Sequence, residues 1–170
     1  RTSVSLPCLP WYHYQAFERL IFMENENEYE LPSRNSLQPL AMTASYDILT
    51  YIDMDAPVDV MQIVSSLCGT SYEEADYFVK ANAVMTVKHL NEMKDAFRPF
   101  MKWRFERLPL LRQAILLLSY SHYFYVDPTV NKGVVIDIAV KLAKRYLGEN
   151  DYQFVNAILD KVLQDRERLE

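Results

Sequence analysis

The chain has 170 residues, of which 50% are hydrophobic and only 3 are glycine, and its formal net charge is −5. This length is typical of one domain with a sizeable core, and the scarcity of glycine excludes a glycine-rich phosphate-binding loop and a sheet protein built on tight turns. Cys8 and Cys68 have neither metal-ligand nor disulfide-framework spacing, so we interpret them as reduced thiols of a cytoplasmic protein.

Apolar residues recur at helical spacing along most of the chain, which predicts an all-α protein of about seven helices in a single domain over residues 1–170. An acidic, polar connection is expected over residues 24–33. The first three helices are predicted over residues 11–23, 37–51 (interrupted near Pro39) and 58–68.

A capping box, Ser71-Tyr72-Glu73-Glu74, predicts the start of a long fourth helix that reaches about residue 100. Residues 110–125 are apolar almost all round, which indicates a central buried helix. Its apolar stretch is too short and too polar to span a bilayer, and no membrane association is expected.

Two helices are predicted at the C-terminal end. The first covers residues 135–146, which place apolar and basic side chains on opposite faces, and Gly148 is expected to end it. Asn150 with Gln153 predicts a capping box at the start of the last helix, and Phe154 is expected in the core that this helix shares with residues 110–125.

Charge is distributed unevenly along the chain. Residues 1–70 carry a net charge of −6, whereas residues 98–112 carry +4 and include Phe100, Trp103 and Phe105. Basic residues mixed with aromatic residues are typical of RNA-binding surfaces, through phosphate contacts and base stacking. A solvated basic helix end has the same pattern, so both interpretations stay open.

The sequence indicates neither a metal site nor a catalytic dyad. His13, His89 and His122 lack metal-ligand spacing, and each is interpreted as a surface or core histidine. Ser121 and His122 are adjacent, so their side chains diverge by about 100° on a helix. No cofactor is expected.

The C-terminal helices carry a family resemblance. Residues 135–146, V-I-D-I-A-V-K-L-A-K-R-Y, and residues 150–161, N-D-Y-Q-F-V-N-A-I-L-D-K, resemble the last helical pair of the NusB family of transcription antitermination proteins. Upstream, Trp103 with Arg107-Leu108 and the R-Q-A-I-L run from Arg112 are similar to the family's W-x-x-x-R-[LI] and R-A-I-L motifs. Residues 16–21, A-F-E-R-L-I, are similar to its opening helix, which in the family follows an arginine-rich stretch. Here the corresponding positions hold Leu9, Pro10, Trp11, Tyr12 and His13, so this anchor is either missing or lies upstream of Arg1.

The resemblance implies a NusB-like bundle in two packed subdomains, with no enzymatic activity and a role in transcription antitermination or ribosomal RNA biogenesis. It implies binding of single-stranded ribosomal leader RNA together with a small-subunit ribosomal protein and the transcription machinery, and it leaves a homodimer open. From this resemblance and the basic segment, we expect an RNA-binding groove formed by Trp11, His13, Lys102, Arg104, Arg107, Arg112, Tyr152 and Gln153.

Other functions fit the same residues. One alternative is a protein-interaction module that keeps the NusB fold and has lost RNA binding, and another is the RNA-guiding domain of a ribosomal RNA cytosine methyltransferase. The acidic N-terminal half suggests docking of a basic protein partner by electrostatic steering. The partner-binding residues are expected to be Glu18, Glu24, Glu26, Glu28 and Asp47.

Overall fold

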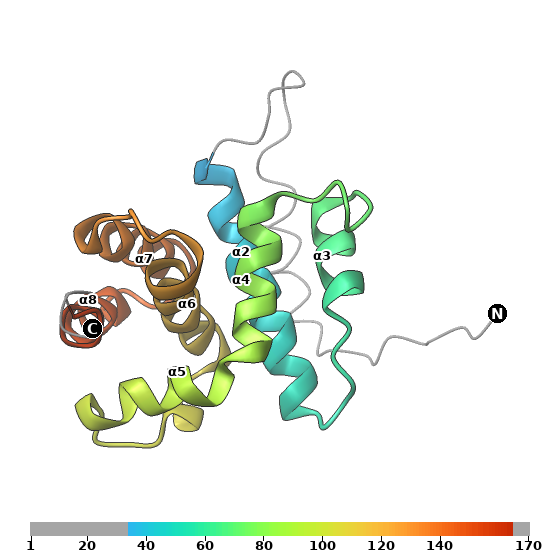
Figure 1. The fold of residues 1–170 in the computed structure, drawn as a ribbon. Coiled ribbons are helices and arrows are strands. Elements are labelled where there is room, and N and C mark those ends of the chain that lie inside the picture. Colours follow the sequence, from blue (N-terminus) through green and yellow to red (C-terminus); the bar gives the residue numbers. More distant parts are fainter. Residues whose placement is uncertain (1–33, 165–170) are drawn as a thin grey trace. The chain divides into compact units, whose positions relative to one another are not determined.

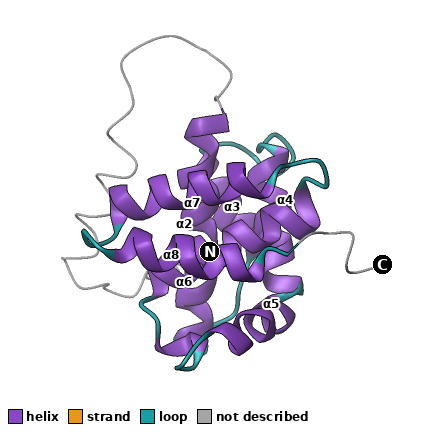
Figure 2. Cartoon of the chain, turned by 90° about the vertical axis from the view of Figure 1, so that its left-hand side faces the viewer, coloured by secondary structure: helices purple, strands orange, loops and turns teal. Residues whose placement is uncertain are grey.

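The computed structural model describes residues 34–164, which belong to one compact unit (Figure 1). Within these residues the chain forms seven α-helices and no strand (Figure 2), which confirms the all-α prediction. No helix among them is long and apolar enough to cross a membrane. The predicted helix over residues 11–23 lies outside the described range. The α-helices are α2 (Arg34–Asp53), α3 (Val60–Cys68), α4 (Tyr77–Lys88), α5 (Leu90–Phe97), α6 (Leu110–Ser121), α7 (Lys132–Tyr146) and α8 (Asp151–Val162).

Three helices, α2, α3 and α4, lie side by side and share one hydrophobic cluster (Figure 1). Ala44 and Ile48 of α2 meet Val64 of α3 and Val79 and Ala83 of α4 in this cluster, and all five side chains are fully buried. Burial of this apolar surface is the main force that holds the three helices together.

Helix α6 is the centre of the remaining structure. It packs against α2, α4, α5, α7 and α8, and its residues from Gln113 to Ser119 are all buried. This confirms the prediction of a central buried helix. After Ser121 the chain continues as a π-helical segment, His122–Val126, and leaves the helix before Asp127 and Pro128.

Pro39 does not interrupt α2, contrary to the prediction. It lies near the start of the helix, so only the backbone hydrogen bond to the carbonyl of Asn35 is lost. The hydroxyl of Thr43 donates a hydrogen bond to the Pro39 carbonyl at 2.8 Å, which gives this carbonyl a side-chain partner. Helix α3 begins at Val60 with Asp59 as its N-cap and ends at Gly69, whose φ of 64° allows the left-handed turn.

The predicted long fourth helix is wrong, because the structure divides it. Ser71 accepts a hydrogen bond from the Glu74 backbone, but this forms only a turn, and Asp76 instead caps the start of α4. His89 leaves helical geometry with φ −117° and separates α4 from α5. Two short 3-10 segments, η1 (Arg98–Phe100) and η2 (Phe105–Arg107), then lead to α6.

The C-terminal pair forms as predicted, with α7 and α8 packed closely on each other. The expected capping box is wrong, because Asn150 makes no side-chain cap hydrogen bond. Asn131, which the sequence did not indicate, caps α7 by accepting a hydrogen bond from the Gly133 backbone. Phe154 is only partly buried, and the adjacent Val155 takes the fully buried position instead.

Candidate nucleic-acid interface

Residues 98–109, which we call the α5–α6 connection, form an irregular segment fixed by two buried rings. Phe97, at the end of α5, and Phe105, in η2, pack with their ring centroids 5.3 Å apart. Proline at position 99 favours the short 3-10 turn, and Pro109 occupies the N-cap position of α6. Apart from Phe105, which is buried, and Met101 and Leu108, which are partly buried, the residues of the connection are exposed.

Most of the charged side chains in this connection are exposed. The side chain of Arg104 is 81% exposed and lies 3.6 Å from the Glu106 carboxylate, which also meets Lys94 at 3.5 Å. A hydrogen bond from its own backbone and the charges of Lys94 and Arg104 lower the pKa of the Glu106 carboxyl. Lys102 and Arg107 are also exposed, so the surface stays positive although Glu106 is ionised.

Arg112 differs from these cations because it joins α6 to α8. Its guanidinium forms an ion pair with Asp151 and lies 5.3 Å from the centroid of the Phe154 ring. The Arg112 side chain is only 20% exposed, and its Nε atom is buried with no hydrogen-bond partner among the described residues. These contacts indicate that Arg112 mainly holds the start of α8 against α6.

The start of α8 lies near two of the predicted RNA-binding residues, Tyr152 and Gln153. Lys144, on α7, places its ammonium group 4.7 Å from the centroid of the partly buried Tyr152 ring, and Gln153 is exposed. Segment η1 and helix α5 both contact α8. Arg112, three residues after the connection, pairs with Asp151, so the end of the connection lies near the start of α8. Trp11 and His13 lie outside the described residues.

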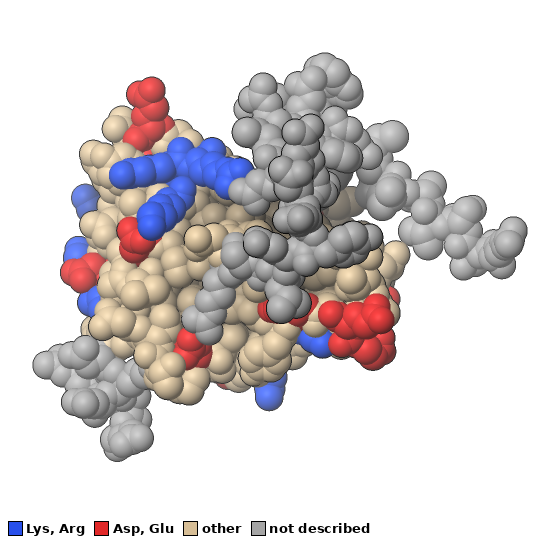
Figure 3. Space-filling view, turned by 90° about the horizontal axis from the view of Figure 1, so that it is seen from above, with Lys and Arg blue, Asp and Glu red and all other residues tan. Residues whose placement is uncertain are grey.

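Sequence reasoning missed Lys144 as part of this surface, although the basic face of residues 135–146 was visible in the pattern. Figure 3, seen from above, shows Lys and Arg side chains gathered on the left, where Figure 1 places α7, whereas α5 and the chain that follows it lie at the bottom of Figure 1. Two of the α7 lysines form ion pairs, Lys132 with Asp160 at 3.0 Å and Lys141 with Asp137 at 2.7 Å.

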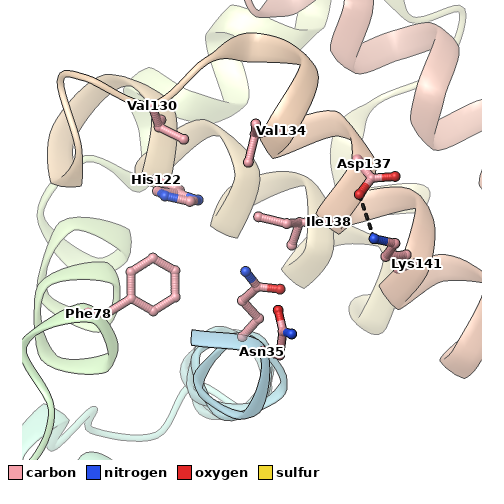
Figure 4. Close-up of a pocket in the computed structure, with 9 residues that line it drawn as sticks. Asn35, Phe78, His122, Val130, Val134, Asp137, Ile138 and Lys141 are labelled. Carbon is pink, nitrogen blue, oxygen red and sulfur yellow. Dashed lines mark ion pairs between the residues drawn. The ribbon is translucent and has the colours of Figure 1, made fainter. Parts of the chain in front are cut away.

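A separate cavity of about 240 Å³ lies between α2, α4, α7 and the π-helical segment (Figure 4). The buried His122 ring packs edge-on against Phe78 in its wall, with ring centroids 4.9 Å apart. Asn35 and the Asp137–Lys141 ion pair contribute polar groups. His122 is thus a core histidine at the edge of a mixed polar and apolar cavity that the sequence did not reveal.

Of the residues expected to bind a protein partner, only Asp47 lies within the described range. It is partly buried in α2, and burial raises the pKa of its carboxyl to about 7. A carboxyl with this pKa is only partly ionised at neutral pH, which weakens its expected part in electrostatic steering. Glu18, Glu24, Glu26 and Glu28 lie outside the described residues, so the acidic docking surface stays a prediction.

The raised pKa of Asp47 gives a testable pH dependence. Between about pH 4 and pH 7 the folded protein holds a proton on Asp47 that the unfolded chain has lost, so this group's contribution to stability is lost as pH rises through that window. The Asp47→Asn variant stays neutral throughout. The difference in melting temperature between Asp47→Asn and the wild type is measured at pH 4 and at pH 8. At pH 4, where Asp47 of the wild type is also neutral, this difference reports the substitution itself. At pH 8 the melting temperature of Asp47→Asn is expected to exceed that of the wild type and to be raised, relative to the wild type, above its pH 4 difference. Parallel pH profiles of the two proteins would contradict this account.

Comparison with known proteins identifies the family. The model of the NusB family matches residues 39–164. The "Transcription antitermination protein NusB" of Borreliella burgdorferi is 26% identical over 135 residues, covering 78% of this chain and 95% of that protein. The protein of the same name from Trichodesmium erythraeum is 40% identical over 124 residues, covering 72% of this chain and 55% of that protein.

A further relative of the same name, from Macrococcus caseolyticus, is 32% identical over 77 residues, and the chain spans only 58% of its length. The solved structure of T. maritima NusB matches with a TM-score of 0.64 and 25% identity, covering 77% of this chain and 90% of that one. The family match begins at Pro39, within α2, so it gives no support to the comparison of residues 16–21 with the family's opening helix. With 126 consecutive residues matched by the family model, the chain belongs to the NusB family.

Proposed function

We propose that the protein is a non-catalytic RNA-binding factor of transcription antitermination, whose target is a single-stranded element of a ribosomal leader transcript. The observation that carries this proposal is the α5–α6 connection, which exposes Lys102, Trp103, Arg104 and Arg107 and leads into α6, whose Arg112 pairs with Asp151 at the start of α8. Cations supply phosphate contacts, and an exposed aromatic ring supplies a surface for an unpaired base.

The names of the relatives support the antitermination role, because all three are called transcription antitermination proteins. The family resemblance adds a small-subunit ribosomal protein as the companion in RNA binding. Docking of that companion through the acidic N-terminal half belongs to the same proposal. Binding of RNA by an irregular basic segment needs no reacting side chain, which is consistent with a non-catalytic factor.

Titration of a labelled single-stranded leader RNA at several salt concentrations tests the proposal. The logarithm of the association constant is expected to fall with the logarithm of salt concentration, with a slope of about −2 to −3, because each phosphate contact on a single strand contributes about −0.7. A scrambled RNA of equal length and composition is the control, since phosphate contacts alone would bind both RNAs equally.

The outcomes separate the proposal from its alternative. Tighter binding of the leader RNA than of the scrambled RNA, with the expected salt slope, supports an RNA-binding factor. Absence of RNA binding at about 50 mM salt contradicts it and favours a NusB-fold protein-interaction module, because electrostatic affinity is greatest at low salt.

A further inference from the structure

The structure sorts the three aromatic residues of the basic segment into different environments. Phe105 is 4% exposed and belongs to the core, and Phe100 is 39% exposed. Trp103 is 68% exposed, so most of its ring lies in solvent. Tryptophan side chains are usually largely buried, and an exposed one in a charged segment is a candidate contact for a ligand.

The indole of Trp103 is held by a neighbouring cation. The guanidinium of Arg107 lies 5.8 Å from the centroid of the ring, within the range of a cation–π contact. Arg107 lies over the ring, and the large exposed fraction of Trp103 leaves much of the indole surface open to solvent. The ring is therefore oriented without being buried.

The charges around Trp103 favour a polyanion as its ligand. Lys102 and Arg104 flank it in the chain and are both exposed. The connection, residues 98–109, carries a net charge of +3, which attracts a chain of phosphates more strongly than it attracts a neutral or basic protein surface. The combination of an exposed indole and flanking cations is the arrangement by which proteins bind single-stranded nucleic acid.

We propose that Trp103 is a base-stacking residue: an unpaired base of single-stranded RNA lies on the exposed surface of its indole, while Lys102 and Arg104 contact the neighbouring phosphates. This inference rests on the proposed RNA-binding function and adds to it the residue that holds a base. Phosphate contacts do not distinguish bases, so the stacked indole is the part of this surface that senses whether the RNA is single-stranded.

Intrinsic fluorescence tests the contact directly. The chain has two tryptophans, Trp11 and Trp103, so the Trp11→Phe variant leaves Trp103 as its only indole. Adding single-stranded leader RNA to this variant is expected to quench the emission, with saturation at the RNA concentration that saturates binding. Emission that stays constant while the labelled RNA binds would overturn the proposal.

Affinity measurements separate stacking from charge. The Trp103→Leu variant is expected to bind RNA about 5- to 100-fold more weakly, with Trp103→Phe in between, because stacking contributes in proportion to the aromatic surface. The salt slope is expected to stay unchanged in both variants, whereas Arg104→Gln is expected to reduce it by about 0.7. Because Trp103 is exposed, its variants are expected to fold, which a thermal melt checks.

Three results would count against the inference in distinguishable ways. Equal RNA affinity of Trp103→Leu and wild type overturns the stacking role and leaves the proposed function standing. Loss of a ribosomal-protein partner with unchanged RNA affinity assigns the indole to protein docking instead. Failure of the wild-type protein to bind RNA at low salt removes the proposed function and this inference together.

Discussion

Replacing Phe97 by alanine is expected to lower the free energy of unfolding by about 3–5 kcal/mol. Phe97 is fully buried at the end of α5, and its ring centroid lies 5.3 Å from that of Phe105 and 6.0 Å from that of Tyr120. It is therefore the contact at which α5, η2 and α6 meet. The alanine variant loses the transfer free energy of the ring and leaves a cavity that three packed elements cannot close fully.

Phe100 provides a matched control three residues away. The Phe100→Ala variant removes the same atoms from a ring that is 39% exposed, and it is expected to lose only about 1–2 kcal/mol. Urea denaturation of the two variants and the wild type, monitored by circular dichroism, measures both values. A loss for Phe97→Ala no larger than that for Phe100→Ala would show that Phe97 does not anchor the α5–α6 connection.

The elements that the sequence predicted correctly are those in which a periodic apolar pattern and tertiary packing agree. Helix α6 is nearly all apolar and lies at the centre, and residues 135–146 alternate between a buried and a solvated face as their spacing indicates. In such segments the pattern that forms the helix also buries it, so local and global preferences coincide.

The predictions that failed depend on local geometry that a periodic pattern does not contain. A single helix from Ser71 to residue 100 satisfies the apolar spacing, yet the chain turns at His89, where the ring stacks on Tyr125 at a centroid distance of 4.4 Å. That contact joins residues 36 positions apart in the sequence, so no local window could reveal it. Phe154 was similarly assigned to the core, but its ring lies partly exposed beside the Arg112 guanidinium.

The sequence predicted which kinds of residue form the candidate site, but not which of them are exposed, buried or paired. The sequence showed that basic and aromatic residues are mixed between positions 98 and 112. Only the structure shows that Phe105 is a core residue and Trp103 an exposed one, and that Arg112 is paired with Asp151. In an irregular segment the direction of each side chain depends on turns and anchors, which have no fixed period.

The contrast between exposed cations and the paired Arg112 gives the prediction with the largest expected effect on RNA binding. Replacing Lys102, Arg104 and Arg107 together by glutamine is expected to reduce the salt slope of RNA binding by at least about 1.4, since the phosphate contacts of Lys102 and Arg104 contribute about −0.7 each on a single strand, and Arg107 beside the indole adds to this where it also reaches a phosphate. All three side chains are exposed, so the triple variant is expected to keep the fold and stability of the wild type.

Arg112→Gln is the comparison variant, because it removes a positive charge from residues 98–112 at a position outside the α5–α6 connection. Loss of the Arg112 guanidinium leaves the partly buried Asp151 carboxylate without its ion-pair partner. This is expected to lower the free energy of unfolding by about 1–2 kcal/mol. The salt slope is expected to stay near the wild-type value, because the guanidinium is already engaged by Asp151 and Phe154. RNA titrations at about 50 to 200 mM salt and thermal melts of both variants measure the two effects. A slope that falls for Arg112→Gln but not for the triple variant would place the phosphate contacts at the start of α6 and α8, and would remove the α5–α6 connection from the RNA-binding surface.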